Sequence, residues 1–474
     1  MTPGTPFVRW SPGLVGMQAC PHALGGYNHA MALSFTHRPR TGVALCLLGM
    51  LWVSPPARAE QQQERTPREL SLKDALRIAA EHSPVLAQSQ AQADAADGRT
   101  TQARSVLLPQ ITATASYARQ HGAGSQLGLG TFSANASGTY NRFAFGAAAT
   151  QTLWDYEAIE RLRAAGLSFD AARATARASQ LQTALNVRTL FFEARAARAL
   201  IGVQQAAFEN QQLNLNEVDA FVKVGVRPEI DLLQAQTDLA NARVALLSAR
   251  NQYGLAKASL RQAIGLRDAD DFDVTDDTLP ELNQENRALP ILVQDALSHR
   301  PELESLKHER AAAEATLSAA KGTYWPTLQA NAGVTEAGQE PSQLGTNWTV
   351  GVALTWPLFQ GGLSNGMVDE ARALSAVQQS QFDIVALQVQ YDVEQARSTI
   401  ENTQASLSAA DEALRLAKSQ LEQAQARYRQ GISSIIELRD AQFGLTSASA
   451  QLVQAQLNLY RARAQLMAAL GQEA

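Results

Sequence analysis

A ladder of leucine and alanine runs through the C-terminal part of the chain with an unbroken spacing of three and four residues. Its members are Leu438, Ala441, Leu445, Ala448, Leu452, Ala455, Leu459, Ala462, Leu466 and Ala469. Apolar residues at the a and d positions of successive heptads specify a left-handed coiled coil, and alanine in alternate layers lets neighbouring backbones approach closely. The ladder therefore predicts a long helix packed against other helices.

Almost the same ladder occurs 206 residues earlier, as Leu232, Ala235, Leu239, Ala242, Leu246, Ala249, Tyr253, Ala256, Leu260 and Ala263. Glycines stand 40 residues apart in both halves, Gly225 with Gly265 and Gly431 with Gly471, and prolines recur with equal spacing. A period of about 200 residues is too long for a solenoid. The pattern predicts a tandem duplication, with a first repeat at 60–266, an acidic linker at 267–288 and a second repeat at 289–474.

Each repeat predicts a long helical hairpin. Residues 155–224 contain no proline, which allows a helix of about 70 residues and about 105 Å. The second repeat has its counterpart at 363–430. Glycine suits the left-handed end of a helix and proline its first turn, so hairpin tips are expected near Gly225, with Pro228 opening the next helix, and near Gly431. An ordinary loop between globular helices is the alternative.

Before each long helix the spacing of the apolar residues changes. It no longer follows the helical repeat, and every second residue is apolar, as in a strand. Trp348, Val350, Val352, Leu354 and Trp356 alternate with small polar residues, and similar runs follow Pro109 and Pro326, the predicted helix–strand junctions. We expect one β-hairpin in each repeat, at about 110–154 and 327–358, with strands of about nine residues.

These strands match those of a membrane β-barrel, with Trp348 and Trp356 at the two ends of one strand as an aromatic girdle facing outer-membrane lipid. A half-buried sheet in a periplasmic domain would alternate in the same way, but its exposed face would carry charges rather than Thr, Asn and Gly. Four strands cannot close a barrel, and an open edge in hydrocarbon leaves backbone groups unpaired. The barrel must therefore be shared among several chains.

The N-terminus predicts export. Residues 31–59 contain a basic stretch, an apolar run and an A-x-A site, in the order of a cleaved signal peptide. Residues 1–30 have no place in such a signal, so we expect 1–59 to be an extension plus signal, with a possible start at Met31. Both cysteines, Cys20 and Cys46, precede the predicted cleavage site, which leaves no disulfide, thiol nucleophile or cysteine metal site in the exported chain.

Charge and motifs exclude other classes. The whole chain carries −5, and removal of 1–59, whose only charged residues are four arginines, leaves −9, the wrong sign for a nucleic-acid partner. No H-E-x-x-H, P-loop or G-x-S-x-G motif occurs, so no enzyme, cofactor or metal site is predicted. The acidic linker lacks the glycine and glutamate spacing of a calcium loop.

These features together resemble the outer-membrane efflux protein family, the TolC-like channels. The resemblance rests on residues 70–86 at the start of the first repeat, on Pro109 and Pro326 between helix and strand, and on residues 356–359 at the end of a strand. It also rests on the hairpin tips, 225–236 and 431–442. It implies a homotrimer in the cell outer membrane, whose 12-stranded β-barrel continues as a periplasmic α-helical barrel that tapers to a gate. It also implies a mixed, mainly α protomer with long coiled-coil helices, a periplasmic adaptor, and an inner-membrane transporter of RND, ABC or MFS type.

A gate is expected at the tips. Glu437 and Asp440 are three residues apart on one helix face, so a threefold axis would stack them into carboxylate rings that favour cations. In the family such acids line the constriction, a tyrosine here at Tyr428 helps to close it, and Asp231 is the matching acid of the first tip. Ser433 stands where some members carry an arginine that helps to hold the gate closed. We therefore expect the contacts of the closed gate to be looser here. Any one of these acids could instead be a solvated helix-start carboxylate favoured by the dipole.

The sequence thus predicts the exit duct of a tripartite efflux pump or type I secretion system, with adaptor docking at the tips near Gly225 and Gly431. The alternative is a periplasmic coiled-coil adaptor or scaffold that conducts nothing.

Overall fold

A computed structural model describes residues 68–122, 138–267, 271–285 and 287–472. The predicted extension and signal peptide at 1–59 lie outside the described residues. All described elements belong to one compact unit, Thr66–Ala474.

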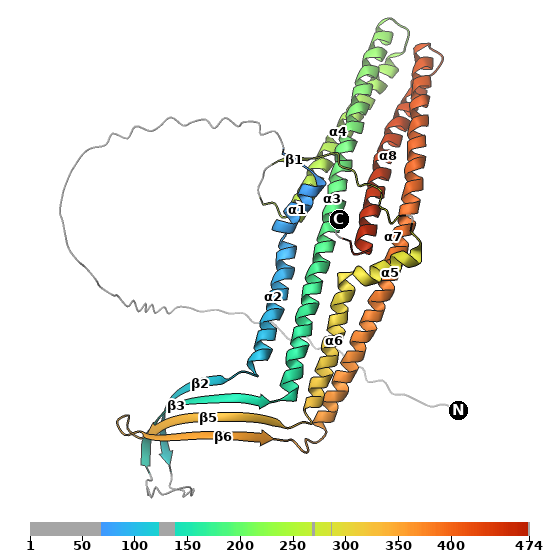
Figure 1. Ribbon diagram of the computed structural model, residues 1–474. Coiled ribbons are helices and arrows are strands. Elements are labelled where there is room, and N and C mark those ends of the chain that lie inside the picture. The colour runs from blue at the N-terminus through green and yellow to red at the C-terminus, as the bar shows by residue number, and fades with distance from the viewer. Residues whose placement is uncertain (1–67, 123–137, 268–270, 286, 473–474) are drawn as a thin grey trace, which may run out of the picture. The chain divides into compact units, whose positions relative to one another are not determined.

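The first half contains β1 (Arg68–Leu70), α1 (Leu72–His82), α2 (Pro84–Ser105), β2 (Gln110–Gly122), β3 (Gly138–Trp154), α3 (Tyr156–Lys223) and α4 (Glu229–Ile264). The second half contains β4 (Phe272–Val274), α5 (Leu289–His299), α6 (Pro301–Gly322), β5 (Thr327–Gly338), β6 (Gly345–Thr355), α7 (Leu363–Arg429) and α8 (Ile435–Ala469). Equivalent helices agree in length, with 68 residues in α3 against 67 in α7, and 36 in α4 against 35 in α8. The mainly α, tandem-duplicated fold with two β-hairpins is confirmed (Figure 1).

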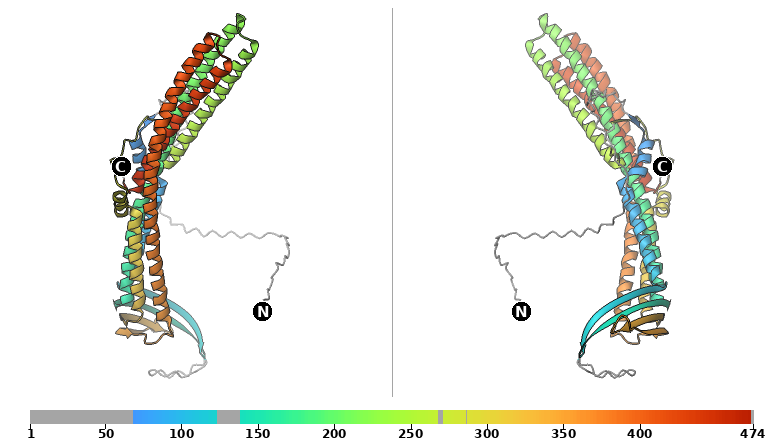
Figure 2. Two further views of the ribbon diagram at one scale, coloured as in Figure 1. Left: turned by 90° about the vertical axis from the view of Figure 1, so that its right-hand side faces the viewer. Right: turned by 90° about the vertical axis from the view of Figure 1, so that its left-hand side faces the viewer.

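The helices pack through the seams that the heptads predict. Every member of both ladders is buried or half-buried. Helix α4 packs along α3, α8 along α7, and α3 also contacts α8, so the two hairpins lie side by side in both views of Figure 2. No described helix combines the length and the apolar character needed to cross a lipid bilayer.

Glycine makes possible one close backbone approach in each repeat. Gly265 and Gly471 follow α4 and α8 with φ of +76° and +70°. A Cβ on Gly265 would collide with the His82 carbonyl at the α1–α2 break, and one on Gly471 would lie 2.9 Å from the His299 carbonyl oxygen at the α5–α6 break. The equal spacing of these glycines therefore reflects two equivalent contacts.

The four long strands form one antiparallel sheet in the order β2-β3-β5-β6. They contain 13, 17, 12 and 11 residues, so the predicted length of about nine was wrong. The reason is that the hydrogen-bonded ladder continues past the apolar band through polar pairs such as Arg119 with Asn141 and His121 with Thr139. Strands β2 and β6 are the edges, and neither has a second neighbour within the described chain.

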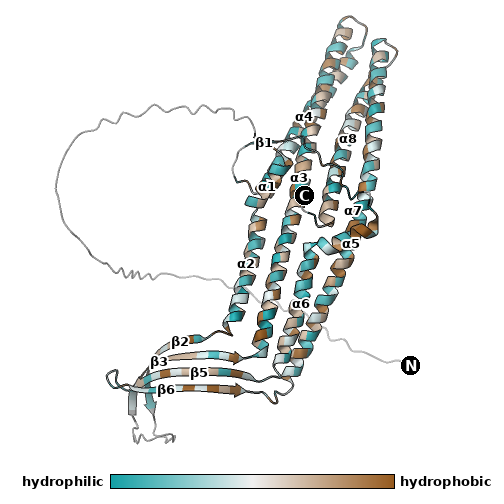
Figure 3. Ribbon diagram, in the orientation of Figure 1, coloured by the Kyte–Doolittle hydropathy of each residue, from teal (hydrophilic) through white to brown (hydrophobic). Residues whose placement is uncertain are grey.

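The register places the apolar residues of all four strands on one face. One row across the sheet reads Ala113, Ala147, Val334 and Trp348, and the adjacent row reads Ile111, Ala149, Ala332 and Val350. Since side chains alternate between faces, the opposite face carries small and polar residues, Thr112, Thr114, Gly146, Gly333, Thr335, Asn347 and Thr349. Apolar positions recur along β5 and β6 in Figure 3.

Aromatic residues mark the helix end of the sheet. Trp356 follows β6 directly, and its indole Nε1 donates to the Tyr324 carbonyl at 3.1 Å. Trp154, which ends β3, and Trp325, just before β5, lie at the same end and were missed in the sequence. Trp348 is the fourth residue of β6, so its predicted place at the strand end was wrong. Trp356 still lies eight positions further along the chain, which is about 27 Å in an extended strand.

Pro109 and Pro326 directly precede β2 and β5. Each proline follows the end of a helix, α2 at Ser105 and α6 at Gly322, because the residue before proline is biased away from helical angles.

The acidic linker is packed as well as charged. Its strand β4 pairs in parallel with β1, and Phe272 and Val274 lie in a core with Phe191 and Leu260. The Tyr253 hydroxyl donates to Asp273 at 2.8 Å, and burial is the main cause that raises the Tyr253 pKa to about 12.

A buried ion pair ties the linker to α8. Arg463 Nη1 donates to the Leu279 carbonyl at 2.8 Å and Nη2 donates to Glu285 Oε2 at 3.5 Å, while Nε lies 2.9 Å from Glu285 Oε1. Both side chains are almost fully buried.

Candidate gate at the hairpin tips

Both helical hairpins turn through a left-handed glycine, Gly225 with φ +76° and Gly431 with φ +75°. Two backbone bonds close each turn. Gly431 N donates to the Tyr428 carbonyl and Ile432 N to the Arg427 carbonyl, both at 3.0 Å, and equivalent bonds form at Gly225. This pattern satisfies helix-end carbonyls that would otherwise lack donors. Pro228 caps α4 instead of lying in its first turn, which corrects the sequence prediction.

The two tips share an apolar core. Its buried members come from three long helices and the start of α8, and they are Val218, Ala235, Leu421, Ala424, Tyr428, Ile435, Leu438 and Ala441. Side chains of both repeats therefore meet at the tips, and separation of the tips would expose this core to water.

Tyr428 is the largest side chain of this core and is 1% exposed. The guanidinium carbon of Arg227, on the first tip, lies 4.4 Å from the centre of the Tyr428 ring. Burial is the main cause that raises the pKa of Tyr428, and the positive charge of Arg227 opposes this rise. The Tyr428 hydroxyl has no hydrogen-bond partner among the described residues. The contact therefore uses the face of the ring and not its hydroxyl.

Arg227 also binds the second tip through its backbone. Its Nη2 donates to the carbonyl of Tyr428 at 3.1 Å and to that of Ser433 at 3.4 Å. Sequence reasoning missed Arg227, although a signal was present. Subtracting 206, the repeat offset, from Ser433 gives Arg227, so the first repeat carries an arginine at the position equivalent to Ser433.

The four acids of the tips have different surroundings. Asp231 is buried in the first turn of α4, and its charge contributes to the raised pKa of Tyr428. Glu437 and Asp440 lie near the start of α8, three residues apart. Glu217, near the end of α3, also contributes to the raised pKa of Tyr428.

The two acids on α8 each have an arginine nearby. Arg427 Nη1 lies 3.4 Å from Glu437 Oε1, and Arg439 Nη2 lies 3.6 Å from Asp440 Oδ1. Both pairs are well exposed and weak in water. The carboxylates thus stand beside positive charge, which the sequence analysis did not foresee.

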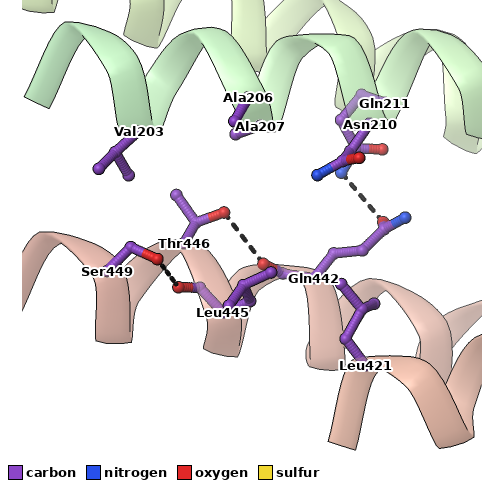
Figure 4. A pocket seen from close by; sticks show the side chains of 10 residues that line it. All are labelled: Val203, Ala206, Ala207, Asn210, Gln211, Leu421, Gln442, Leu445, Thr446 and Ser449. Atoms are coloured by element: carbon purple, nitrogen blue, oxygen red, sulfur yellow. Dashed lines mark hydrogen bonds between the residues drawn. The ribbon is translucent and has the colours of Figure 1, made fainter. Parts of the chain in front are cut away.

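The seam between the hairpins contains polar side chains and two pockets behind the tips, both partly open to solvent. A cavity of about 70 Å³ lies between α3 and α8, where Gln211 donates to Gln442 at 3.0 Å (Figure 4). A second cavity of about 390 Å³, nearer the tips, is lined in part by Asn214, Glu217 and Tyr428. Gln211 Oε1 and Asn214 Oδ1 are buried without a partner among the described residues. Apolar packing between the hairpins is therefore interrupted here.

Comparison with known proteins links both repeats to one family. Residues 75–266 and 292–472 match the outer membrane efflux protein family. Outer membrane protein TolC of Escherichia coli is 26% identical over 425 residues, which cover 82% of this chain and 80% of that protein. A toluene efflux pump outer membrane protein of Pseudomonas putida, TtgF, is 23% identical over 320 residues, so the chain spans 65% of that relative's length.

Solved structures share the fold. The crystal structure of the Campylobacter jejuni CmeC outer membrane channel aligns with a TM-score of 0.75 at 17% identity, over 84% of this chain and 85% of that one. Identity this low establishes the fold and not the activity. Since the family match covers both repeats, however, the chain belongs to the outer membrane efflux protein family.

Proposed function

We propose that this chain forms the outer-membrane exit duct of a tripartite efflux pump or type I secretion system. Membership of the family places it in the outer membrane with a periplasmic extension, as the sequence predicted. The duct conducts substrates passively, and an inner-membrane transporter of RND, ABC or MFS type supplies the energy. As a channel it needs no catalytic residues.

The two-faced sheet is the observation that carries this proposal. One face is apolar across all four strands and the other is small and polar. This alternation suits lipid outside and water inside a barrel. The exposed side chains of Val350 and Val352 then contact lipid, and Thr349 and Asn347 line the lumen.

The unpaired edges support closure by several copies. Each neighbouring pair in the order β2-β3-β5-β6 is antiparallel, so β2 and β6 run in opposite directions. Strand β6 of one copy can therefore pair antiparallel with β2 of the next copy in the same orientation, a contact that closes into a ring. Three copies, as the family resemblance implies, give twelve strands.

The helices carry matching unpartnered faces. Helix α7 has a buried apolar face and, on its opposite side, a stripe of exposed ones, Leu374, Val377, Ile384, Leu387 and Tyr391. Helix α4 repeats this arrangement with Ile230, Leu233, Val244 and Leu247. Exposed apolar side chains on the outer face of both helices fit lateral packing of protomers into a helical barrel.

The tips are suited to dock an adaptor. Around Gly225 and Gly431 five aliphatic side chains are exposed, Val224, Val226, Ile230, Ile432 and Ile436. Exposed charged side chains stand among them, Lys223, Glu229, Arg427 and Arg429. The aliphatic side chains would pack against the helices of a periplasmic adaptor, and the charged ones would pair with its polar groups. Behind the tips we propose the gate of Glu437, Asp440, Asp231 and Tyr428.

Single-channel conductance in a planar bilayer tests the duct. We expect the wild-type protein to give a small, cation-selective conductance that a trivalent cation on the periplasmic side blocks, because the cation binds carboxylates. In Glu437→Ala/Asp440→Ala the block should be lost. If correctly inserted protein conducts no ions in either form, the duct is wrong and the adaptor or scaffold becomes the better assignment.

Paired substitutions in β6 test the orientation of the sheet. We expect Val350→Arg to abolish assembly in the outer membrane, because a charge facing lipid near mid-membrane costs about 2–4 kcal/mol. Thr349→Arg, one residue away on the opposite face, should assemble and change only ion selectivity. The measurement is heat-modifiable migration of outer-membrane protein in gels. Equal loss in both variants would contradict the assignment of faces.

A further inference from the structure

Arg227 is the one described side chain that joins the two tips by both a ring contact and hydrogen bonds. Its guanidinium packs 4.4 Å from the Tyr428 ring centre and donates to the carbonyls of Tyr428 and Ser433 at 3.1 and 3.4 Å. Both partners lie about 200 residues away in sequence, on the other hairpin. A guanidinium suits this site because its planar fork can stack and donate at the same time.

Other links across the tips are weaker or less specific. Arg429 pairs with Glu217 at 2.8 Å, but both side chains are well exposed, and exposed pairs contribute little. Behind the tips the seam contains the two cavities and the unpaired Gln211 and Asn214 oxygens. The shared apolar core and the Arg227 contact therefore carry most of the cohesion at this end.

We propose that Arg227 is the positioning residue that holds the two hairpin tips together in the closed duct. It acts from the first repeat on the backbone of the second, at the position equivalent to Ser433, where the second repeat has no arginine. Separation of the tips requires the guanidinium to leave the Tyr428 ring and both carbonyls. This inference rests on the proposed function, because it assigns a role to one residue of the same gate.

The acidic groups near this contact both come from the first hairpin, one from α3 and one from α4. Asp231 and Glu217 are near enough to affect the Tyr428 pKa, and both are acidic. They favour the positive charge of Arg227 at this place. Loss of the arginine would therefore leave a ring without its cation, two carbonyls without this donor and two acids without this countercharge.

The first test compares Arg227→Ala with Lys223→Ala in planar bilayers. Lys223 lies in the same tip and carries the same charge, but its partner Asp219 is one turn away on its own helix. We expect Arg227→Ala to raise the open fraction on the order of tenfold, the size expected for loss of one cation–π contact with its hydrogen bonds. Lys223→Ala should match the wild type. Equal open fractions in the two variants would overturn the proposal.

Two further variants separate a specific contact from a general loss of structure. Arg227→Lys keeps the charge over the ring but not the planar fork, so it should restore part of the closed state. Tyr428→Leu removes the ring and leaves the backbone carbonyls, and should open the duct as Arg227→Ala does. If Arg227→Ala fails to fold, Tyr428→Leu decides the question instead. An open fraction of Tyr428→Leu equal to that of the wild type would overturn the proposal.

A second readout does not depend on conduction. Ser433 is 6% exposed, so the thiol of Ser433→Cys, in full-length protein with Cys20→Ser and Cys46→Ser, should react slowly with a maleimide. We expect Arg227→Ala to speed this reaction about tenfold, by the same loss of interactions, and Lys223→Ala to leave it unchanged. If the wild type conducts nothing, the proposed function fails, and this rate alone decides whether Arg227 holds the tips. Equal rates in both variants would overturn it.

Discussion

Gly265→Ala should cost more stability than any other single methyl group added to α4 or its ends. Alanine at φ +76° is strained by about 1–2 kcal/mol, and the new Cβ would collide with the backbone carbonyl of His82. Because backbone cannot rotate away as a side chain can, the α1–α2 break would have to separate from the end of α4. We expect a total loss of about 3 kcal/mol or more. The measurement is the apparent melting temperature from helical circular dichroism.

Two other glycines separate strain from collision. Gly225 has the same φ of +76°, but a Cβ there meets nothing within 4 Å, so Gly225→Ala should lose only about 1–2 kcal/mol. Gly254, inside α4, has neither positive φ nor a close neighbour, and Gly254→Ala should gain about 0.5–1 kcal/mol from helix propensity. Similar losses at Gly225 and Gly265 would show that the His82 contact does not matter.

Arg463→Met should be the second severe substitution. The Arg463 side chain is 8% exposed and that of Glu285 is 4% exposed, and their nearest atoms lie 2.9 Å apart. Methionine fills much of the space but leaves Glu285 buried without its countercharge, which costs about 3–5 kcal/mol. Glu285 still accepts bonds from the Leu282 amide and Gln404, which do not replace a positive charge. Melting temperature measures the loss.

The double variant Arg463→Met/Glu285→Met should recover most of that loss, because an apolar pair can replace a buried ion pair at little net cost. Arg415→Met is the matched control. Arg415 pairs with Glu412 on the surface of α7, with both side chains about two-thirds exposed or more, and its loss should change stability by under about 0.5 kcal/mol. An Arg463→Met variant as stable as this control would refute the structural role of the buried pair.

Much of the architecture can be predicted from the spacing of apolar residues over short stretches of the sequence. Heptad ladders fixed which face of α4 and α8 packs inward, and every ladder position is at least half-buried. Alternation in β5 and β6 predicted the two faces of the sheet, because side chains alternate in any strand. Strand length was harder to predict, since hydrogen bonding continued through polar residues outside the apolar band.

The candidate gate was predicted only in part. Resemblance and spacing proposed Tyr428, Asp231, Glu437 and Asp440 as gate residues. The structure brings Tyr428 and Asp231 together with Arg227. Arg439 directly precedes Asp440 in the sequence, but only the structure shows that Arg427 of α7 lies beside Glu437 and that both arginine side chains turn toward these acids. Spacing along a helix gives the neighbours on that helix, but not which long, flexible side chains turn toward them.

The sequence by itself determined the long helices, the position of both turns and the two faces of the strands, because these depend on residues a few positions apart. It also showed the duplication, because the ladder recurs at an offset of 206 residues. Only the tertiary structure decided that Arg227 contacts Tyr428, that Arg463 is buried with Glu285, and that β1 pairs with β4. Those contacts join residues that are far apart along the chain, and their formation depends on how whole helices pack.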